Sequence, residues 1–142
     1  GSLDRPAMRR RVFAEPDARK RLEGIIHPRV RELLRAACMR AVGPYTIAAV
    51  PLLAEGGGRR AYPWLQRIAV VDVPESAQLQ RLLQRDGIDE VLARRMIAAQ
   101  ASRQQRLAVA DDVLVNDGTL EALDGQVAAL DRLYRNLAAA SR

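Results

Sequence analysis

Apolar residues recur at helical spacing through the first third of the chain. Asp4 is a suitable N-cap and predicts a short helix over residues 4–13. A second helix is predicted over residues 16–27, and we expect His27-Pro28 to end it, because the residue before a proline is pushed out of the α region. A third helix is predicted over residues 28–42, where apolar positions lie three and four apart.

From residue 45 onward the pattern changes to short apolar runs without polar alternation, which is typical of strands covered on both faces. Such runs occupy residues 45–53 and 68–73, and a weaker one occupies 113–116. Helical spacing returns over 75–85 and again after Thr119, where the last helix is expected to pack on the sheet. Strands that alternate with helices predict an α/β fold with a parallel sheet.

Residues 89–107 also have a helical pattern, but residues 100–106 carry almost no apolar face. A helix that is polar nearly all round is not held by a core, so this segment is either a solvated bridge or a mobile lid over an anionic ligand. Gln100, Arg103 and Arg106 would share one helical face. Guanidinium groups offer a planar fork of donors that suits phosphate oxygens, so a nucleotide lid is one of the two interpretations.

Composition narrows the possibilities further. The chain has 142 residues, 49% hydrophobic and 28% charged, which is typical of one globular domain. No apolar run is long enough to cross a bilayer, so no membrane partner is expected. The single cysteine, Cys38, cannot form an internal disulfide, which fits a reducing compartment, and its place on an apolar stripe predicts a buried, inert thiol.

Several site chemistries find no support in the sequence. His27 is the only histidine, so a histidine metal cluster is excluded, and no metal ligands are expected. The glycines at 56–58 run into Arg59 and Arg60 without the lysine of a phosphate-binding loop, so we interpret them as an ordinary loop.

Two non-enzymatic interpretations compete. The net charge of +6 suits a small basic nucleic-acid-binding module, although acidic residues are interleaved and aromatic residues are scarce. No helix-turn-helix or zinc pattern is present. An interaction scaffold built on the last amphipathic helix is the other possibility, but its apolar stripe is more simply explained as core.

The chain carries a series of short motifs in a fixed order: Leu3-Asp4-Arg5, His27-Pro28, Val50-Pro51-Leu52-Leu53-Ala54-Glu55, Val70-Val71-Asp72-Val73-Pro74, Gln100-Ala101-Ser102-Arg103, Arg106-Leu107-Ala108-Val109-Ala110-Asp111-Asp112 and Asn116-Asp117-Gly118. Each motif is weak alone. Together they resemble the dephospho-coenzyme A kinase family, and the resemblance extends over essentially the whole chain.

The resemblance implies a P-loop NTPase fold of the nucleotide-kinase type, with a parallel sheet, a helical substrate-binding part and a lid. The expected parts of this single kinase domain are a coenzyme-binding part at 3–44, core strands and a helix at 45–86, the lid at 87–110, and a core strand with the C-terminal helix at 111–142. The implied reaction is phosphorylation of the 3′-hydroxyl of dephospho-CoA by ATP with Mg²⁺, in the cytoplasm.

The resemblance also implies roles for individual residues. The lid would place two catalytic arginines on the phosphates, Arg103 and Arg106. Residues expected to bind the substrate are Arg5, His27, Pro28, Leu52 and Glu55. Residues expected to bind the nucleotide are Gln100, Asn116 and Gly118. Dephospho-CoA is the expected partner, and no nucleic acid is expected.

One departure from the family pattern matters for activity. Members begin with a strand, a P-loop and a segment with a pair of aspartates, whereas here Gly1-Ser2 leads directly into the Leu3 motif. We therefore predict that this chain alone is inactive and holds no cofactor tightly. The missing strand is expected between 45–53 and 68–73, which leaves the sheet incomplete. Another chain or self-association could supply it, but a longer parent protein is the explanation that we favour.

Overall fold

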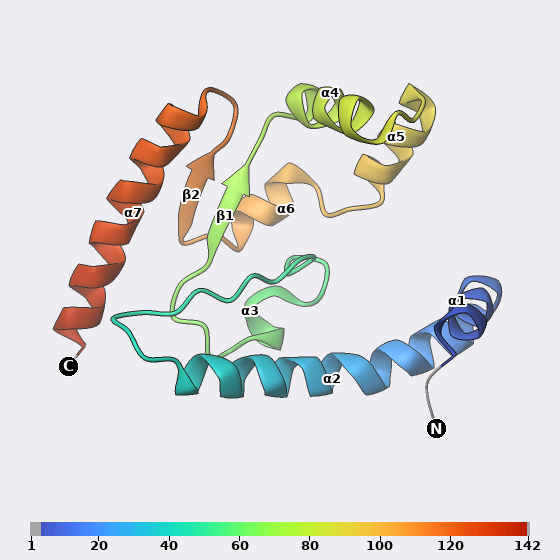
Figure 1. The fold of residues 1–142 in the computed structure, drawn as a ribbon, viewed down its shortest axis with the longest axis horizontal. Helices are drawn as coiled ribbons and strands as arrows, with labels where there is room; N and C mark the ends of the chain where they lie inside the picture. The colour runs from blue at the N-terminus through green and yellow to red at the C-terminus, as the bar shows by residue number, and fades with distance from the viewer. Residues whose placement is uncertain (1–3, 142) are drawn as a thin grey trace. The chain divides into compact units, whose positions relative to one another are not determined.

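A computed structural model describes residues 4–141 (Figure 1). The chain divides into two compact units. Unit 1 comprises the residues up to Val42 together with 46–48, and unit 2 comprises 43–45 together with the residues from Ala49 onward. Leu3, which opens the first of the family motifs, lies outside the described residues.

Unit 1 is built from two helices. Helix α1 spans Arg5–Ala14, and the Asp4 carboxylate accepts a hydrogen bond from the Ala7 N–H at 2.9 Å, so the predicted N-cap is confirmed. Helix α2 spans Pro16–Arg40 and packs against α1. Cys38 lies on α2 and is half-buried, so the predicted full burial of its thiol is not observed.

The predicted helix break at His27-Pro28 is wrong, because α2 continues through Pro28 as one helix of 25 residues. Proline removes the hydrogen bond to the carbonyl four residues earlier and crowds that carbonyl. Here that residue is Gly24, which lacks a Cβ, and no side chain or other segment lies within 4 Å of the Cβ position, so the backbone can adjust around the ring. The helix then ends at Arg40, before Gly43-Pro44.

Unit 2 contains a two-stranded parallel sheet, as the alternation of strands and helices predicted. Strand β1 spans Ala69–Asp72 and strand β2 spans Asp112–Val115. The register pairs Ala69 with Asp112 and Asp72 with Val115. Both strands therefore end at the same edge of the sheet.

The predicted strand over residues 45–53 is wrong. Residues 45–50 have no regular structure, and residues 51–57 form turns in which Leu52 adopts a φ of 58°. An apolar run becomes a strand only where a neighbouring strand pairs with its backbone, and within the described residues β1 pairs with β2 alone. The loop predicted at the glycines is present, but Gly58 already begins the short helix α3, Gly58–Ala61.

The remaining helices of unit 2 are α4 (Glu75–Asp86), α5 (Glu90–Ala98), α6 (Arg103–Ala108) and α7 (Leu120–Ala140). Helices α4 and α7 match their predictions. The single helix predicted over 89–107 is wrong, because α5 and α6 are separate. Ser102 caps α6 by accepting the Gln105 N–H, and the Gln105 side chain accepts the Ser102 N–H in return. This reciprocal capping starts a new helix at Arg103.

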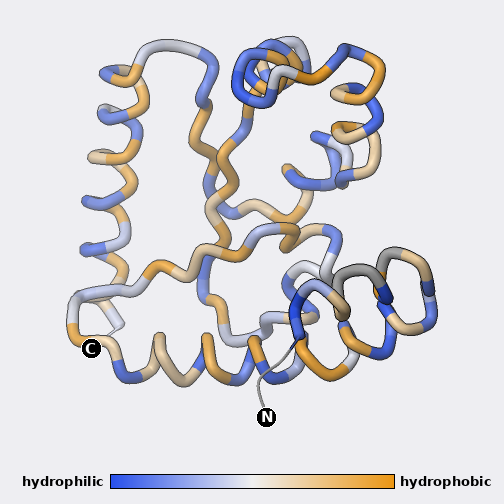
Figure 2. Tube along the Cα trace, turned by 45° about the vertical axis from the view of Figure 1, so that its right-hand side comes forward, coloured by the Kyte–Doolittle hydropathy of each residue, from blue (hydrophilic) through white to orange (hydrophobic). Residues whose placement is uncertain are grey.

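Helix α7 packs against β2, as its apolar stripe predicted, and Figure 2 shows apolar and polar residues alternating along it. The Tyr134 hydroxyl donates to the Asp112 carboxylate at 2.8 Å, and Arg67 binds the same carboxylate through Nε and Nη2. Gln126 binds the outer edge of β2, because its amide accepts the Val115 N–H and donates to the Val115 carbonyl, both at 2.8 Å. These contacts join α7 to the sheet.

Candidate functional site

A group of polar residues gathers where β1 and β2 end. Asp72 is the last residue of β1, and its carbonyl accepts the Asn116 N–H at 2.8 Å, directly after β2. Asp117 and Gly118 follow, before helix α7 begins. In open parallel sheets ligands bind in the crevice beyond the carboxyl ends of the strands. The sequence and the register therefore place this group where an α/β protein binds its ligand.

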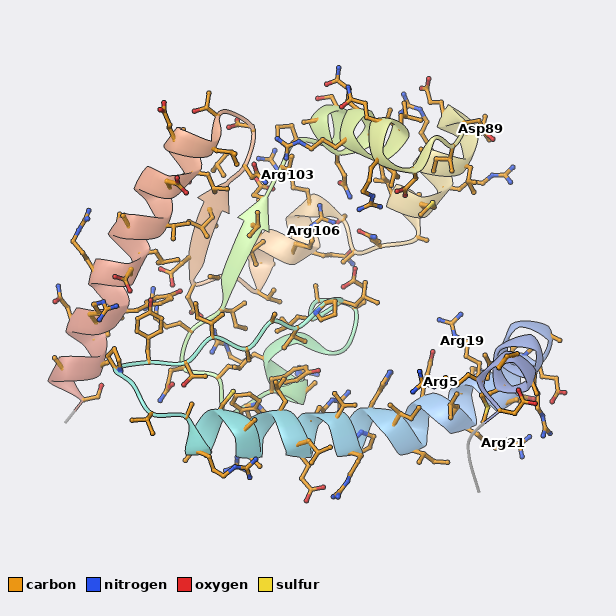
Figure 3. All side chains as sticks on the ribbon, viewed as in Figure 1. Arg5, Arg19, Arg21, Asp89, Arg103 and Arg106 are labelled. Carbon is orange, nitrogen blue, oxygen red and sulfur yellow. The ribbon has the colours of Figure 1, made fainter. Side chains whose placement is uncertain are left out.

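Arg103, which is labelled in Figure 3, binds Asp72 through a two-pronged ion pair. Its Nε donates to Oδ1 at 2.9 Å and to Oδ2 at 3.1 Å, and its Nη2 donates to Oδ2 at 2.6 Å. Only 3% of the Asp72 side chain is exposed, against 57% of the Arg103 side chain. Helix α6 thus delivers its first residue to the end of β1.

The charges of this cluster stabilise one another. The hydrogen bonds from Arg103 lower the pKa of Asp72, and burial of the carboxylate opposes that shift without reversing it. The positive charge of Arg106 lowers the pKa of Asp72 further. Asp117 helps to raise the pKa of Arg103, although Asp72 is the main cause. Asp72 is therefore ionised at neutral pH.

A second contact fixes the segment that leads into α6. The Glu55 carboxylate accepts the Ala101 N–H at 2.7 Å, and the Ala101 carbonyl accepts a hydrogen bond from Arg106 Nη1. The peptide groups on both sides of Ala101 are thereby held, one by the turn after residue 50 and one by α6 itself. The residue before the Ser102 cap is thus held on both sides.

The structure brings some of the predicted site residues together and leaves others apart. Arg103, Asn116 and Gly118 lie around the strand ends, and Arg106 lies on the same helix as Arg103. Gln100 is exposed and precedes the Ser102 cap, so the prediction that it shares a helical face with the arginines is wrong. Leu52 is 61% exposed in its turn.

The other predicted substrate-binding residues, Arg5, His27 and Pro28, belong to unit 1. Arg5 opens α1, and the other two lie in the middle of α2. Sequence reasoning did not assign a site role to Asp72. The sequence signal that could have identified Asp72 is a carboxylate at the end of an otherwise apolar strand. In a parallel sheet this end of the strand lies at the edge where ligands bind.

The parallel sheet, the charged strand ends and the arginine-bearing helix define a class, the α/β proteins that bind a ligand at the carboxyl edge of a parallel sheet. The solved structure of TT1252 from Thermus thermophilus has a similar fold, with a TM-score of 0.72 at 33% identity, covering 94% of this chain and 69% of that one. A dephospho-CoA kinase from Campylobacter jejuni is similar in fold, with a TM-score of 0.67 at 22% identity, covering 95% of this chain and 67% of that one.

The chain belongs to the dephospho-CoA kinase family, whose family model matches residues 1–122. It is 56% identical over 135 residues to the dephospho-CoA kinase of Xanthomonas euvesicatoria pv. vesicatoria, which covers 95% of this chain and 66% of that protein. It is 54% identical over 138 residues to the enzyme of Xylella fastidiosa (strain Temecula1), covering 97% and 67%. The chain thus spans about two thirds of these relatives, 66% and 67% of their lengths.

Within residues 4–141, no helix is both long enough and apolar enough to cross a membrane.

Proposed function

We propose that this chain forms the substrate-binding, lid and C-terminal core parts of a dephospho-CoA kinase, which transfers the γ-phosphoryl group of ATP to the 3′-hydroxyl of dephospho-CoA. The observation that carries the proposal is the meeting of Asp72, Arg103 and Asn116 at the carboxyl end of the sheet. Membership of the family supplies the reaction class. The parts proposed are residues 3–44 for the coenzyme, 87–110 for the lid, and the remainder for the core.

The proposed roles of the lid residues follow from charge. Phosphoryl transfer depends on positioning and on neutralising negative charge rather than on covalent chemistry by the protein. Arg103 and Arg106 each carry a permanent positive charge next to the strand ends. Asn116 and Gly118, in the loop after β2, would contact the nucleotide. Leu52 and Glu55 would line the substrate side of the same unit.

The site has side chains that suit the phosphates of ATP. When bound, ATP with Mg²⁺ supplies the transferable phosphoryl group. The exposed guanidinium of Arg103 fits phosphate oxygens. In the part of the chain that the structure describes, no three acidic, histidine or cysteine side chains form a metal cluster. We therefore assign the ATP phosphates to the arginines.

Charge distribution supports the proposed coenzyme-binding part. Residues 1–42 contain eleven Lys and Arg against five Asp and Glu, whereas residues 43–142 contain twelve of each. The whole net charge of +6 therefore lies in the N-terminal segment. Dephospho-CoA carries a pyrophosphate, which such a segment attracts. Arg5, His27 and Pro28 belong to this segment.

The test uses the chain alone and a chimera. The chimera joins the part of the Xanthomonas euvesicatoria relative that precedes its counterpart of Leu3-Asp4-Arg5 to the start of this chain. Both proteins are mixed with ATP, Mg²⁺ and dephospho-CoA, and CoA is measured. We expect product from the chimera and none from the chain alone, because the chain has no glycine loop with a lysine for the β- and γ-phosphates.

Matched variants of the chimera test the lid. Arg103→Ala is expected to lower kcat by about 10²–10³, the usual cost of losing one donor to the developing charge. Arg135→Ala is the control, because Arg135 also pairs with an aspartate, Asp131, but on the exposed surface of α7. A folded chimera that makes no CoA would refute the proposed function, and product from the chain alone would refute only its predicted inactivity.

A further inference from the structure

The Arg103 guanidinium has one edge that is bound and one that is free. A guanidinium offers five N–H donors in a rigid fork. The contact with Asp72 uses the Nε edge and part of Nη2. Nη1 makes no hydrogen bond within residues 4–141, and 57% of the side chain is exposed. Arg103 can therefore be held by the protein and still offer donors to an incoming ligand.

Asp72 is better placed than any surface carboxylate to hold this arginine. Its side chain is 3% exposed, and it is the last residue of β1, whose backbone is fixed by pairing with β2. The Val73 backbone N–H also lowers the pKa of this carboxylate. By contrast, the other half of the pair sits on α6, a helix of only six residues. Asp72 is thus the rigid member of the pair, and the long side chain of Arg103 is the one that becomes ordered.

We propose that Asp72 is a positioning residue, which fixes the Arg103 fork so that its Nη1 edge is already oriented for a phosphate oxygen. This inference rests on the proposed function, in which Arg103 contacts phosphate. Arginine loses substantial rotamer freedom when it binds a ligand, and a partner that has already ordered the side chain removes part of that cost. Asp72 itself touches no phosphate in this arrangement.

A competing arrangement makes the opposite prediction. If Asp72 held Arg103 away from the ligand, phosphate would have to displace the carboxylate, and removal of the Asp72 charge would tighten binding. The two arrangements differ at one atom, because positioning keeps Arg103 Nε–H on Asp72 in the bound state and competition releases it.

The first experiment needs no change to Asp72. Tripolyphosphate is titrated into the 142-residue chain, and the arginine Nε–H signals are followed by NMR, with the Arg103 signal assigned from the spectrum of Arg103→Lys. Positioning predicts that the Arg103 Nε–H signal shifts but remains protected from exchange at saturation. Loss of that protection on saturation would overturn the proposal.

The second experiment is a double-mutant cycle on tripolyphosphate affinity. Asp72→Asn keeps the side-chain shape and is expected to weaken binding about threefold to tenfold, the equivalent of ordering one long side chain. In the Arg103→Ala background the same substitution should have no further effect, because the residue to be positioned is gone. Asp86→Asn is the matched control, since Asp86 also pairs with an arginine, Arg85, but on the exposed surface of α4.

The cycle separates failure of this inference from failure of the proposed function. If Arg103→Ala weakens binding while Asp72→Asn leaves it unchanged or tightens it, the positioning role is overturned and the phosphate role of Arg103 stands. If Asp72→Asn weakens binding equally in both backgrounds, its effect is structural and the inference is overturned. If Arg103→Ala has no effect on tripolyphosphate affinity, the positioning role of Asp72 and the phosphate role of Arg103 are both overturned. A variant that does not fold leaves the exchange measurement on the unaltered chain as the deciding test.

Discussion

The hydroxyl group of Tyr134 is expected to contribute measurably to the stability of unit 2. It donates to Asp112 Oδ2 at 2.8 Å and so links α7 to the start of β2. The substitution Tyr134→Phe removes this hydrogen bond and keeps the ring, which packs edge-to-face on Tyr45 with centroids 5.5 Å apart. The comparison therefore isolates one polar contact.

The size of the stability loss caused by Tyr134→Phe depends on which bonds of Asp112 remain after the substitution. Hydrogen bonds to charged groups contribute about 1.5–3 kcal/mol. Asp112 keeps both of its bonds to Arg67, at 2.7 Å each, so the carboxylate is not left unpaired. The expected loss in the free energy of unfolding at pH 7 is therefore near the lower end, about 1–2 kcal/mol.

The same contact predicts a pH dependence. Burial and the hydrogen bond to Asp112 raise the pKa of Tyr134 from 10.0 to about 12. Because the folded state favours the neutral phenol, its contribution is complete below pH 10 and is lost as the pH rises from 10 to about 12. Water screens part of this effect, so the loss is again about 1–2 kcal/mol. The difference in the free energy of unfolding between Tyr134→Phe and the unaltered protein should therefore vanish near pH 12.

The assay is urea unfolding followed by the fluorescence of Trp64, the single tryptophan, which lies in unit 2. It is run from pH 7 to 12 on the chain and on the chimera, because the contact lies wholly within unit 2. Tyr45→Phe is the comparison, since its hydroxyl bonds to Asp131, which keeps an exposed partner in Arg135. A difference between Tyr134→Phe and the unaltered protein that stays constant up to pH 12 would refute the reasoning.

Two further predictions concern the backbone. Pro28→Ala should stabilise α2 by about 1–3 kcal/mol, because it restores the hydrogen bond to the Gly24 carbonyl; an unchanged or lower helix signal on heating, followed by circular dichroism, would contradict this. Glu55→Ala should speed hydrogen exchange at the Ala101 amide about fivefold to tenfold, because that N–H loses its acceptor, while the Leu92 amide, capped by Asp89, serves as the unchanged reference. Equal exchange at Ala101 in both proteins would show that Glu55 does not hold the peptide.

Local signals in the sequence predicted most of the secondary structure. Asp4 and Thr119 accept N–H groups of the first helical turn, and these caps were readable because capping depends on residues three apart. The same local reasoning did not recognise the cap at Ser102, whose partner Gln105 forms the capping box. It also overestimated the tendency of Pro28 to end a helix, because the effect of a proline depends on the residue four positions earlier.

Non-local features were harder to predict. The apolar run at 45–53 satisfied every local criterion for a strand, but pairing is decided by a neighbour that the pattern of the run does not contain. The contact of Asp72 with Arg103 joins residues 31 positions apart, and that of Arg67 with Asp112 joins residues 45 apart. The arginines of the site were singled out by the polar helical pattern of residues 100–106, and the family resemblance gave them their role. The carboxylate that holds Arg103 required the register of the sheet.

The Gln126 amide has a consequence for how this sheet can be extended. Its two bonds to Val115 occupy one backbone donor and one backbone acceptor on the outer edge of β2. A side-chain amide here imitates the backbone of a neighbouring chain and closes that border to recruitment. A further strand that docks on β2 would have to displace the Gln126 side chain, whereas docking on the other side of β1 would not.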